Sequence, residues 1–331
     1  MRRLCVIPGD GIGQEVVPVA VRVLERLLPD LQVTEAETGW DCFQRLGQSV
    51  PEATLQAMRD CGAGLFGAVS SPSTAVAGYR SAILTLRQQL ALGVNLRPVR
   101  SWPGLSDKPG VDLLILRENS EGLYVGKEHM ATADLAIAEC HISRQASEHI
   151  AQRASEIAKL RSSQRITLVH KANVLPLTCG LFRDSCRKVL DAHGLSALVD
   201  ERLVDVAALQ LVETPEEFDL IVTTNLFGDV LSDLASHWGG GLGLAPSLNW
   251  GQGIALAEPV HGSAPDIAGS GRANPLAAVL SAGLLLRYHW QLIEQADRLD
   301  RAVEGLLRSM GKADWGKQTT RRVEQELIAR L

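Results

Sequence analysis

Three arginines, Arg87, Arg97 and Arg117, could together bind a small anionic molecule. Arg97 precedes a proline at the end of a predicted segment, and Arg117 follows the apolar run Val111–Leu116. The ends of strands are where α/β proteins bind ligands, and guanidinium groups hold carboxylates through paired hydrogen bonds. Three such groups suit an acid with several carboxylates. Surface arginines paired with nearby acidic side chains are the alternative for each residue taken separately.

Two aspartates, Asp229 and Asp233, follow the predicted strand Leu220–Val222 and are four residues apart. On a helix this spacing turns both carboxylates the same way, where they repel each other. A hard cation such as Mg²⁺ or Mn²⁺ prefers oxygen ligands and would relieve that repulsion. A solvated acidic helix face, or a charge pair at the helix N-terminus, explains the pair equally well when it is taken alone.

Two further side chains could move protons. Lys171 comes directly after the predicted strand Ile166–Val169 and His170, and burial or neighbouring cations can lower the pKa of a lysine until it accepts protons. Tyr124 could donate a proton. The alternative is that its side chain only packs at the base of the antiparallel arm predicted below for Gly122–Ile142.

The glycine-rich turn Gly9–Gly13 stands between the first predicted strand and the first predicted helix, where a dinucleotide fingerprint would be placed. The third glycine of that fingerprint is replaced by Gln14 or Val16, according to where the count begins. Asp10 would also repel a pyrophosphate at the helix N-terminus. A tight turn with a helix cap is the alternative.

A second loop, Glu258–Gly269, is rich in small residues that let backbone approach a flat ligand closely. Asp266 in this loop can accept hydrogen bonds from ribose hydroxyls but would repel a 2′-phosphate. If the loop holds an adenosine, the cofactor is therefore NAD rather than NADP. An ordinary long loop is the alternative for this segment alone.

The elements that must position these residues alternate along the chain. Apolar runs predict strands at Leu4–Ile7, Gly64–Phe66, Val111–Leu116, Ile166–Val169 and Leu220–Val222. Amphipathic spacing predicts helices at Glu15–Leu28 and Ser143–Leu160. Strands that alternate with helices predict a largely parallel α/β architecture.

Some segments depart from this alternation. Gly122–Ile142 holds two short β-like stretches, which suggests an antiparallel arm that could contact a second subunit. Glycines and prolines at Pro98–Gly110, Gly239–Gly243 and Pro246–Gly253 predict breaks, and these are candidate crossover points between domains.

Composition excludes several classes of protein. Lys and Arg number 33 and Asp and Glu 38, a net charge of −5, which argues against a nucleic-acid partner. Hydrophobic residues make up 46%, enough to fill a core and to exclude disorder. The longest apolar run, Leu276–Leu286, is shorter than the roughly 20 residues that cross a bilayer, and no secretory segment is recognised. We expect a cytoplasmic protein without a membrane span.

The cysteines are scattered and form no C-x-x-C pair; they are Cys5, Cys42, Cys61, Cys140, Cys179 and Cys186. This pattern predicts reduced thiols that are mostly buried, rather than disulfides or a zinc site.

Taken together, the motifs are similar to those of the β-decarboxylating dehydrogenase family, whose members act on isocitrate, 3-isopropylmalate, homoisocitrate or tartrate. The similarity covers nearly the whole chain and is carried by Gly9–Gly13, Leu86-Arg87, Asn95–Pro98, Arg117–Tyr124, His170–Asn173, Asn225–Asp233 and the loop from His261 to Asn274-Pro275.

This resemblance implies the two-domain α/β fold of isocitrate and isopropylmalate dehydrogenases, which is not a Rossmann fold. Residues 1–98 and 252–331 would form the NAD-binding domain, and residues 99–251 the second domain, with an antiparallel dimerisation arm at about 122–142. The substrate would bind between the domains of a homodimer with shared active sites, and dimers could pair into a tetramer.

The resemblance also assigns roles. Arg87, Arg97 and Arg117 would bind substrate carboxylates, while Asp229, Asp233 and Asp205 of the partner subunit would bind Mg²⁺ or Mn²⁺. Lys171 of the partner subunit would take the hydroxyl proton, and Tyr124 would protonate the enol carbon. Ser71, Leu84 and Asn173 would also contact the substrate. The expected NAD contacts are Val69, Ser70, Ser71, Asn173, His261, Gly262, Ser263, Ala264, Pro265, Asp266, Ile267 and Asn274.

The expected substrate depends on the stretch Gly78–Arg87, which is most similar to the homoisocitrate members. Isopropylmalate members usually have an acidic residue where this chain has Arg80, whereas Ile83 and Leu84 form an apolar wall like that of the isopropylmalate pocket. We expect NAD-dependent oxidative decarboxylation of (2R,3S)-homoisocitrate to 2-oxoadipate and CO₂, in lysine biosynthesis through 2-aminoadipate. The alternatives are 3-isopropylmalate in leucine biosynthesis, isocitrate as a secondary substrate, and a catalytically silent regulatory subunit.

Overall fold

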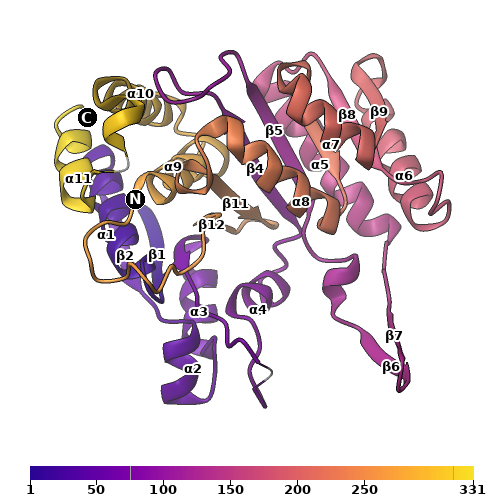
Figure 1. The fold of residues 1–331 in the computed structure, drawn as a ribbon, viewed down its shortest axis with the longest axis horizontal. Helices are drawn as coiled ribbons and strands as arrows, with labels where there is room; N and C mark the ends of the chain where they lie inside the picture. The colour runs from indigo at the N-terminus through magenta and orange to yellow at the C-terminus, as the bar shows by residue number, and fades with distance from the viewer. Residues whose placement is uncertain (75, 316) are drawn as a thin grey trace. The chain divides into compact units, whose positions relative to one another are not determined.

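The chain divides into two units, each with its own strands and helices (Figure 1). The computed structural model describes residues 1–74, 76–315 and 317–331, with the backbone alone at 312–315. Unit 1 comprises Met1–Leu92, Ser101–Pro109 and Trp238–Leu331, and unit 2 comprises Gly93–Arg100 and Gly110–His237.

The strands of unit 1 are mostly parallel. In the order β2 (Leu31–Glu35), β1 (Arg2–Gly9), β3 (Ala63–Ala68) and β12 (Ala255–Pro259) they run in one direction, and β11 (Pro246–Trp250) pairs antiparallel with β12. Strands buried on both faces are expected to be continuously apolar, as β3 is.

The helices of unit 1 lie along these strands. They are α1 (Gly13–Leu27), α2 (Trp40–Leu46), α3 (Glu52–Cys61), α4 (Ala82–Gln89), α9 (Leu276–Leu284), α10 (Ile293–Trp315) and α11 (Thr320–Ile328). Every residue of α9 is buried, which accounts for the longest apolar run of the sequence. Among the described residues, no helix is both long and apolar enough to span a membrane.

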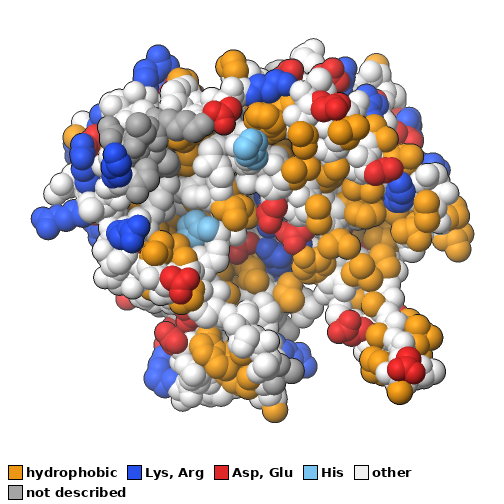
Figure 2. All heavy atoms as spheres, viewed as in Figure 1, with side chains coloured by type: hydrophobic (Ala, Val, Ile, Leu, Met, Phe, Trp, Pro, Cys, Tyr) orange, Lys and Arg blue, Asp and Glu red, His pale blue; other side chains and the backbone are white. Residues whose placement is uncertain are grey.

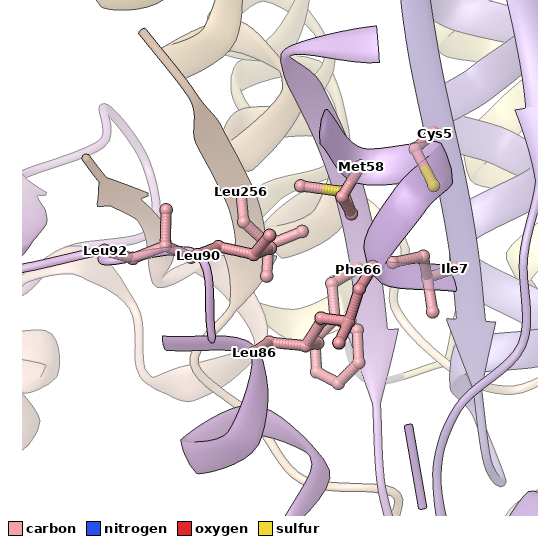
Figure 3. Packing of buried hydrophobic residues seen from close by; sticks show 9 residues of the cluster. Cys5, Ile7, Met58, Phe66, Leu86, Leu90, Leu92 and Leu256 are labelled. Atoms are coloured by element: carbon pink, nitrogen blue, oxygen red, sulfur yellow. The ribbon is translucent and has the colours of Figure 1, made fainter. Parts of the chain in front are cut away.

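An apolar cluster joins β1, α3, β3, the end of α4 and β12 in unit 1 (Figure 3). Phe66 packs there with Met58 and Leu86, and Leu256 contributes from β12. Burial raises the pKa of the Cys5 thiol in this cluster to about 12, so the side chain stays a neutral hydrophobe.

Apart from the β6–β7 hairpin described below, unit 2 has one antiparallel and four parallel strands. The strand β4 (Val94–Arg100) pairs antiparallel with β5 (Asp112–Glu118), and β10 (Leu220–Thr223), β8 (Ile166–His170) and β9 (Val199–Leu203) continue from β5 in parallel. The helices of this unit are α5 (Arg144–Arg161), α6 (Thr178–Ala192), α7 (Val204–Glu213) and α8 (Asn225–Ser236).

The predicted antiparallel arm is confirmed. Strands β6 (Glu128–Thr132) and β7 (Leu135–Ala138) pair with each other, and a bridge between Gly122 and His141 closes their base. In Figure 1 this hairpin extends away from the rest of unit 2, and all of its strand residues are exposed.

The predicted strands and the two predicted helices are all confirmed. The predicted break Pro98–Gly110 includes the segment between β4 and β5, where Ser101–Pro109 belongs to unit 1, although Pro98 itself lies within β4. The predicted break Pro246–Gly253 begins with a strand, because Pro246 opens the fully buried β11. The fixed φ of proline is compatible with extended backbone, so a proline alone does not end a strand. The cysteine prediction holds for four of the six residues, while Cys61 is half-buried and Cys140, between β7 and the base of the arm, is exposed.

His149 of α5 predicts a pH-dependent contribution to stability. Its half-buried ring packs close to Gly93, and burial, followed by the charge of Arg153, lowers the pKa of His149. The unfolded chain, with its ordinary pKa near 6.5, therefore binds a proton first as the pH falls, and stability declines between about pH 6.5 and the depressed folded-state pKa. When the pH is lowered from about 7 to 5.5, the unfolding free energy of the wild type should fall. For His149→Gln we expect this fall to be smaller by roughly 0.5–1 kcal/mol.

Urea unfolding at several pH values measures this difference. His129→Gln, a change in the exposed arm, is the matched control and should follow the wild type. Parallel pH profiles for His149→Gln and the wild type would show that the prediction is wrong.

Candidate active site

Polar side chains gather where the parallel strands of unit 2 end. Arg117 is the penultimate residue of β5, Asn225 opens α8 after β10, and Lys171 follows β8. Because these neighbouring strands are parallel, their carboxyl ends lie at one edge of the sheet. The sequence placed all three residues after strands, and the parallel pairing brings the strand ends together.

Arg117 is the most deeply buried charge of this edge, with 1% of its surface exposed. Its Nε and Nη2 donate to Oδ1 of Asn225 at 3.0 and 2.7 Å, and its Nη1 pairs with Asp229. Gly228 is needed here, because a Cβ at that position would meet the Arg117 side chain at 2.7 Å. The guanidinium is thus fixed by α8 before any ligand binds.

Arg97, on β4, reaches the same helix. Its Nε donates to Oδ1 of Asn95 at 2.7 Å, and its Nη1 donates to Ser232 at 2.8 Å and Asp233 at 3.1 Å. Its Nη2 lies 3.3 Å from Oδ1 of Asp229. Asp229 therefore stands between two buried guanidinium groups.

The two aspartates of α8 present oxygens to solvent on their other side. The Asp229 and Asp233 side chains are 30% and 54% exposed. Burial, reinforced by the charge of Asp229, raises the pKa of Asp233 against the opposing effect of Arg97. With Arg97 and Arg117 the aspartates form a balanced group of two positive and two negative charges, which we call the α8 charge cluster.

Tyr124 lies against this cluster. Its hydroxyl donates to Oδ2 of Asp229, and its ring centroid is 4.9 Å from the Arg117 guanidinium carbon. Burial, and then the hydrogen bond to Asp229, raise the pKa of Tyr124. The phenol is therefore protonated at neutral pH and can act as an acid.

The donor set of α8 fits a hard divalent cation only in part. Two carboxylates on one helix face offer the oxygen ligands that Mg²⁺ and Mn²⁺ prefer. Within the described part of the chain, however, no three acidic, histidine or cysteine side chains form a group that could hold a metal. The two carboxylates of α8 thus supply only part of such a ligand set.

Asp205, the third expected metal ligand, is paired elsewhere in this chain. It lies in the first turn of α7, 62% of its side chain is exposed, and Lys171 Nζ donates to it at 2.6 Å. That hydrogen bond lowers the pKa of Asp205. Lys171 and Asp205 thus form an accessible pair.

The turn that carries Lys171 is fixed by His170. The buried ring accepts from the amide of Ala172 at Nδ1, 3.1 Å, so its Nε2 carries the proton and faces Glu201 at 3.2 Å. Arg187 holds the other oxygen of Glu201. Asn173, an expected substrate and cofactor contact, lies exposed in the same turn.

Arg87 belongs to unit 1 and has its own partners. Its Nη2 donates to Oε1 of Glu258 at 2.8 Å and its Nε to Oδ1 of Asn249 at 3.0 Å. Asn249 also donates to Glu258 at 2.8 Å. All three are buried, and Leu84 lies one turn before Arg87 in α4, half-buried.

The sequence analysis did not single out the partners of the arginines as site residues. These partners are Asn95, Asn225, Ser232, Asn249 and Glu258. A detectable signal exists for Asn95, which is two residues from Arg97 and so on the same face of β4. Glu258 and Asn249 are far from Arg87 in sequence, and only the pairing of β11 with β12 brings the two together.

The expected cofactor residues of unit 1 lie in two loops that touch. Val69–Ser71 follow β3, and Ser70 Oγ is 2.9 Å from Oγ of Ser263. His261, Gly262 and Ala264–Ile267 lie between β12 and α9, where burial lowers the pKa of His261. Asn274 links this loop to α9, because its side chain donates to Gly243 and accepts from the amide of Leu276.

The glycine-rich turn has a backbone role. A Cβ at Gly11 would lie 2.2 Å from the carbonyl oxygen of Ser263, and one at Gly9 would lie 2.1 Å from that of Ala68. Both glycines also have positive φ. The alternative of a tight turn is therefore supported, but without a side-chain cap for α1, since the Ile12 amide donates to Ser263 at 2.9 Å instead.

An apolar face covers the exposed side of α7 and α8, which pack against each other. It consists of Val206, Leu209, Val212, Val230 and Leu234, each at least 36% exposed. Figure 2 shows hydrophobic side chains gathered where Figure 1 places these two helices. The nearby loop after β8 adds Val174, Leu175 and the 85% exposed Leu177.

Comparison with known proteins identifies the group to which these features belong. A model of the isocitrate/isopropylmalate dehydrogenase family matches residues 3–327. The chain belongs to this family. It is therefore an enzyme of the dehydrogenase class, with the α/β fold that the motifs predicted, and the glycine-rich turn is not a Rossmann fingerprint.

Individual relatives support the same assignment. An isocitrate/homoisocitrate dehydrogenase of Thermus thermophilus is 52% identical over 305 residues, 92% of this chain and 90% of that protein. A homoisocitrate dehydrogenase of Methanocaldococcus jannaschii is 43% identical over 317 residues, with the same coverage. The crystal structure of isocitrate dehydrogenase from Methylococcus capsulatus aligns with a TM-score of 0.93 at 37% identity and covers 100% of this chain and 99% of that one. The names of these relatives differ in substrate.

The α8 charge cluster predicts that Asp229 stabilises the fold. Asp229→Ala would leave Arg97 and Arg117 without their shared counter-charge. We expect a loss of roughly 2 kcal/mol in unfolding free energy, below the 3–5 of a fully buried pair because Asp229 is partly exposed. Asp233→Ala, at the more exposed end of the same helix, should cost less than about 1 kcal/mol. Urea unfolding in a chelator compares the two, and equal losses would contradict the assignment.

Proposed function

We propose that this enzyme catalyses the NAD-dependent oxidative decarboxylation of (2R,3S)-homoisocitrate to 2-oxoadipate and CO₂. The α8 charge cluster is the observation that carries this proposal, since it combines buried guanidinium donors with accessible carboxylates, and the protonated phenol of Tyr124 lies against it. A hydroxy acid with three carboxylates needs these groups in one site.

Arg97 and Arg117 would bind two substrate carboxylates. Their guanidinium groups already face Asp229 from two sides, so a substrate carboxylate can replace that partner without new orientation of the arginines. Arg87, held by Glu258 and Asn249, would bind a further carboxylate. Buried partners hold each arginine in one rotamer, which favours a substrate of defined shape.

Asp229 and Asp233, with Asp205 of the partner subunit, would hold Mg²⁺ or Mn²⁺. Such a cation, when bound, supplies a Lewis acid that stabilises negative charge developing on substrate oxygens. The exposed sides of both α8 carboxylates are available for this role, and their partial exposure leaves room for water ligands.

Lys171 of the partner subunit would take the proton of the substrate hydroxyl, and Tyr124 would return a proton to the enol carbon. Asp205 orients the Lys171 amine, and His170 fixes the turn below it. The raised pKa of Tyr124 keeps its proton available at neutral pH.

Residues of unit 1 would bind the dinucleotide, which supplies the hydride acceptor. Val69, Ser70, Ser71 and the loop His261–Ile267 would contact it, together with Asn274 and Asn173. Asp266 is exposed in this loop, and its carboxylate favours ribose hydroxyls over a 2′-phosphate, which supports NAD over NADP.

The substrate choice rests on α4 and on the relatives. Homoisocitrate is supported by the names of the relatives with 52% and 43% identity and by Arg80, which stands where isopropylmalate enzymes usually have an acid. Leu84 supports 3-isopropylmalate instead, because an apolar side chain suits an isopropyl group. A relative of Archaeoglobus fulgidus named 3-isopropylmalate dehydrogenase is 43% identical over 305 residues.

The deciding experiment measures kcat/KM on homoisocitrate, 3-isopropylmalate, isocitrate and tartrate, with NAD or NADP and Mg²⁺ or Mn²⁺. We expect homoisocitrate with NAD to be preferred over 3-isopropylmalate by about tenfold or more, within the range that one pocket contact provides. Chelation of the metal should abolish turnover, and Mg²⁺ or Mn²⁺ should restore it.

Each other outcome has a meaning. A preference for 3-isopropylmalate would assign the enzyme to that substrate, and equal use of NADP would overturn the role of Asp266. No turnover of any of the four acids would favour a regulatory subunit.

We further propose a homodimer in which each subunit completes the site of the other. The apolar face of α7 and α8 is adjacent to the exposed Lys171–Asp205 pair, and its exposed side chains would be buried by a second copy. Asp205 and Lys171 would then enter the partner's site together, because both lie beside the same interface. The exposed arm would add a second area of contact, and pairing of dimers into a tetramer remains compatible with this arrangement.

Mixed dimers test the shared site. Asp205→Asn and Asp233→Asn homodimers should both be inactive, but a dimer with one subunit of each kind would contain one intact site. Random assortment should therefore recover about a quarter of the wild-type activity, and mixed dimers purified from that mixture should have about half. Co-expression with two different tags, assayed before and after purification of the mixed dimers, measures both values. Sites complete within one subunit would give no recovery at all.

A further inference from the structure

Asp10, within the glycine-rich turn of unit 1, is a buried carboxylate that the proposed reaction does not use. Only 2% of its surface is exposed. Its Oδ2 accepts from the backbone amides of Trp40 and Ser70, each at 2.8 Å, and its Oδ1 accepts from Asp41 at 3.2 Å. The three donors come from two segments that lie about 30 and 60 residues further along the chain.

The surroundings of Asp10 are built around its side chain. A Cβ at Gly39 would lie 2.4 Å from Asp10 Oδ2, and Gly39 has a φ of +109°, so only glycine fits there without strain. The amides of Trp40 and Asp41 belong to the first turn of α2, and no side chain of its own caps this helix. Asp10 is therefore the cap of α2, supplied from a distant turn.

Ser70 connects this carboxylate to the expected cofactor loops. Its amide donates to Asp10, its carbonyl oxygen accepts from the Tyr79 hydroxyl at 3.2 Å, and its Oγ is 2.9 Å from Oγ of Ser263. The Tyr79 ring packs edge-on against Trp40 and Phe43 of α2, with centroids 5.3 and 5.2 Å apart. Both sides of the Ser70 turn are thus tied to α2 and Asp10.

The backbone of the turn that contains Asp10 is joined to the other cofactor loop as well. The Asp10 amide donates to Ala68 at 2.7 Å and the Ile12 amide to Ser263 at 2.9 Å. One short turn therefore contacts the end of β3, the Ser70 turn and the Ser263 loop. The two carboxylate oxygens of Asp10 accept three amide hydrogen bonds, which a side chain with a single acceptor oxygen could not accept in the same geometry.

We propose that Asp10 is a positioning residue for dinucleotide binding: its carboxylate sets the place of the Val69–Ser71 turn beside the Ser263 loop. This inference rests on the proposed function, in which both loops contact the cofactor. Asp10 would not itself touch the dinucleotide, because three amides occupy its oxygens and their dipoles balance its charge.

The test is Asp10→Asn, which keeps the shape of the side chain but has a single acceptor oxygen. Its NH₂ group would face the amide of Asp41 or those of Trp40 and Ser70, so at least one bond is lost. We expect the Kd for NADH, from fluorescence titration, and the KM for NAD to rise about tenfold, as for one lost hydrogen bond to a charged group. The KM for the acid and kcat should change by less than about threefold.

Two further variants separate positioning from general stability. Asp41→Asn removes a charge from the next exposed residue of α2 and leaves the Asp10 bonds intact, so it should bind NADH like the wild type. Tyr79→Phe removes the bond to the Ser70 carbonyl and should weaken NADH binding in the same direction as Asp10→Asn. All titrations are made well below the melting temperature of each variant.

Hydrogen exchange gives a readout that needs no activity. In the protein without ligand, Asp10→Asn should speed exchange in peptides that contain Ser70 and Trp40, while peptides of unit 2 should be unchanged. If Asp10→Asn lowers the melting temperature but keeps wild-type exchange at Ser70 and wild-type affinity for NADH, Asp10 is only structural and the proposal is wrong.

The outcome for the wild type separates this inference from the proposed function. If the wild type binds NADH but oxidises none of the acids, the proposed reaction fails while the role of Asp10 is still decided by the titration. If the wild type binds no dinucleotide, the inference is overturned together with the cofactor assignment.

Discussion

The position of Asp229 between Arg97 and Arg117 is the interaction on which the site in unit 2 depends. Burying two guanidinium groups costs folding free energy unless a counter-charge is close, and the Asp229 carboxylate on α8 forms an ion pair with both. Gly228 lets α8 approach β5 closely enough for this, and Asn225 satisfies the remaining donors of Arg117. Under the proposed function, the arginines would need little reorganisation to bind a substrate carboxylate, because their partners already hold them in place.

Unit 1 follows the same physical rule with different residues. Arg87 is buried beside Glu258 and Asn249, and Asp10 is buried among three backbone amides. The hydrogen-bond partners of each buried charge come from segments that are far apart in the sequence. The charge therefore depends on the tertiary fold for its partners, and its hydrogen bonds in turn hold those segments together. The close glycines at positions 9, 11 and 39 are required for these contacts, since a Cβ at any of them would overlap its neighbour.

One subunit offers only two carboxylates for the proposed cation, and it has an exposed apolar face. Within the described residues Asp229 and Asp233 have no third acidic, histidine or cysteine side chain in reach, whereas the exposed Asp205 stands on α7 directly before the apolar face. A symmetric dimer would bury the apolar face and bring Asp205 of each subunit to the α8 carboxylates of the other through one interface. Chemistry and assembly would then depend on the same two helices.

The sequence by itself determined the alternating architecture, the arm and the family, because apolar periodicity and spaced motifs are local properties of the chain. It identified the two arginines and two aspartates of the α8 charge cluster by residue type and by position near the ends of predicted elements, although Arg97 and Arg117 lie within β4 and β5. The tertiary structure alone decided their partners: Asn249 and Glu258 reach Arg87 through strand pairing, and Asp10 reaches Trp40 and Ser70 across the turn. A buried charge must be satisfied by whatever group the fold brings within hydrogen-bond distance, and sequence separation carries no information about that distance.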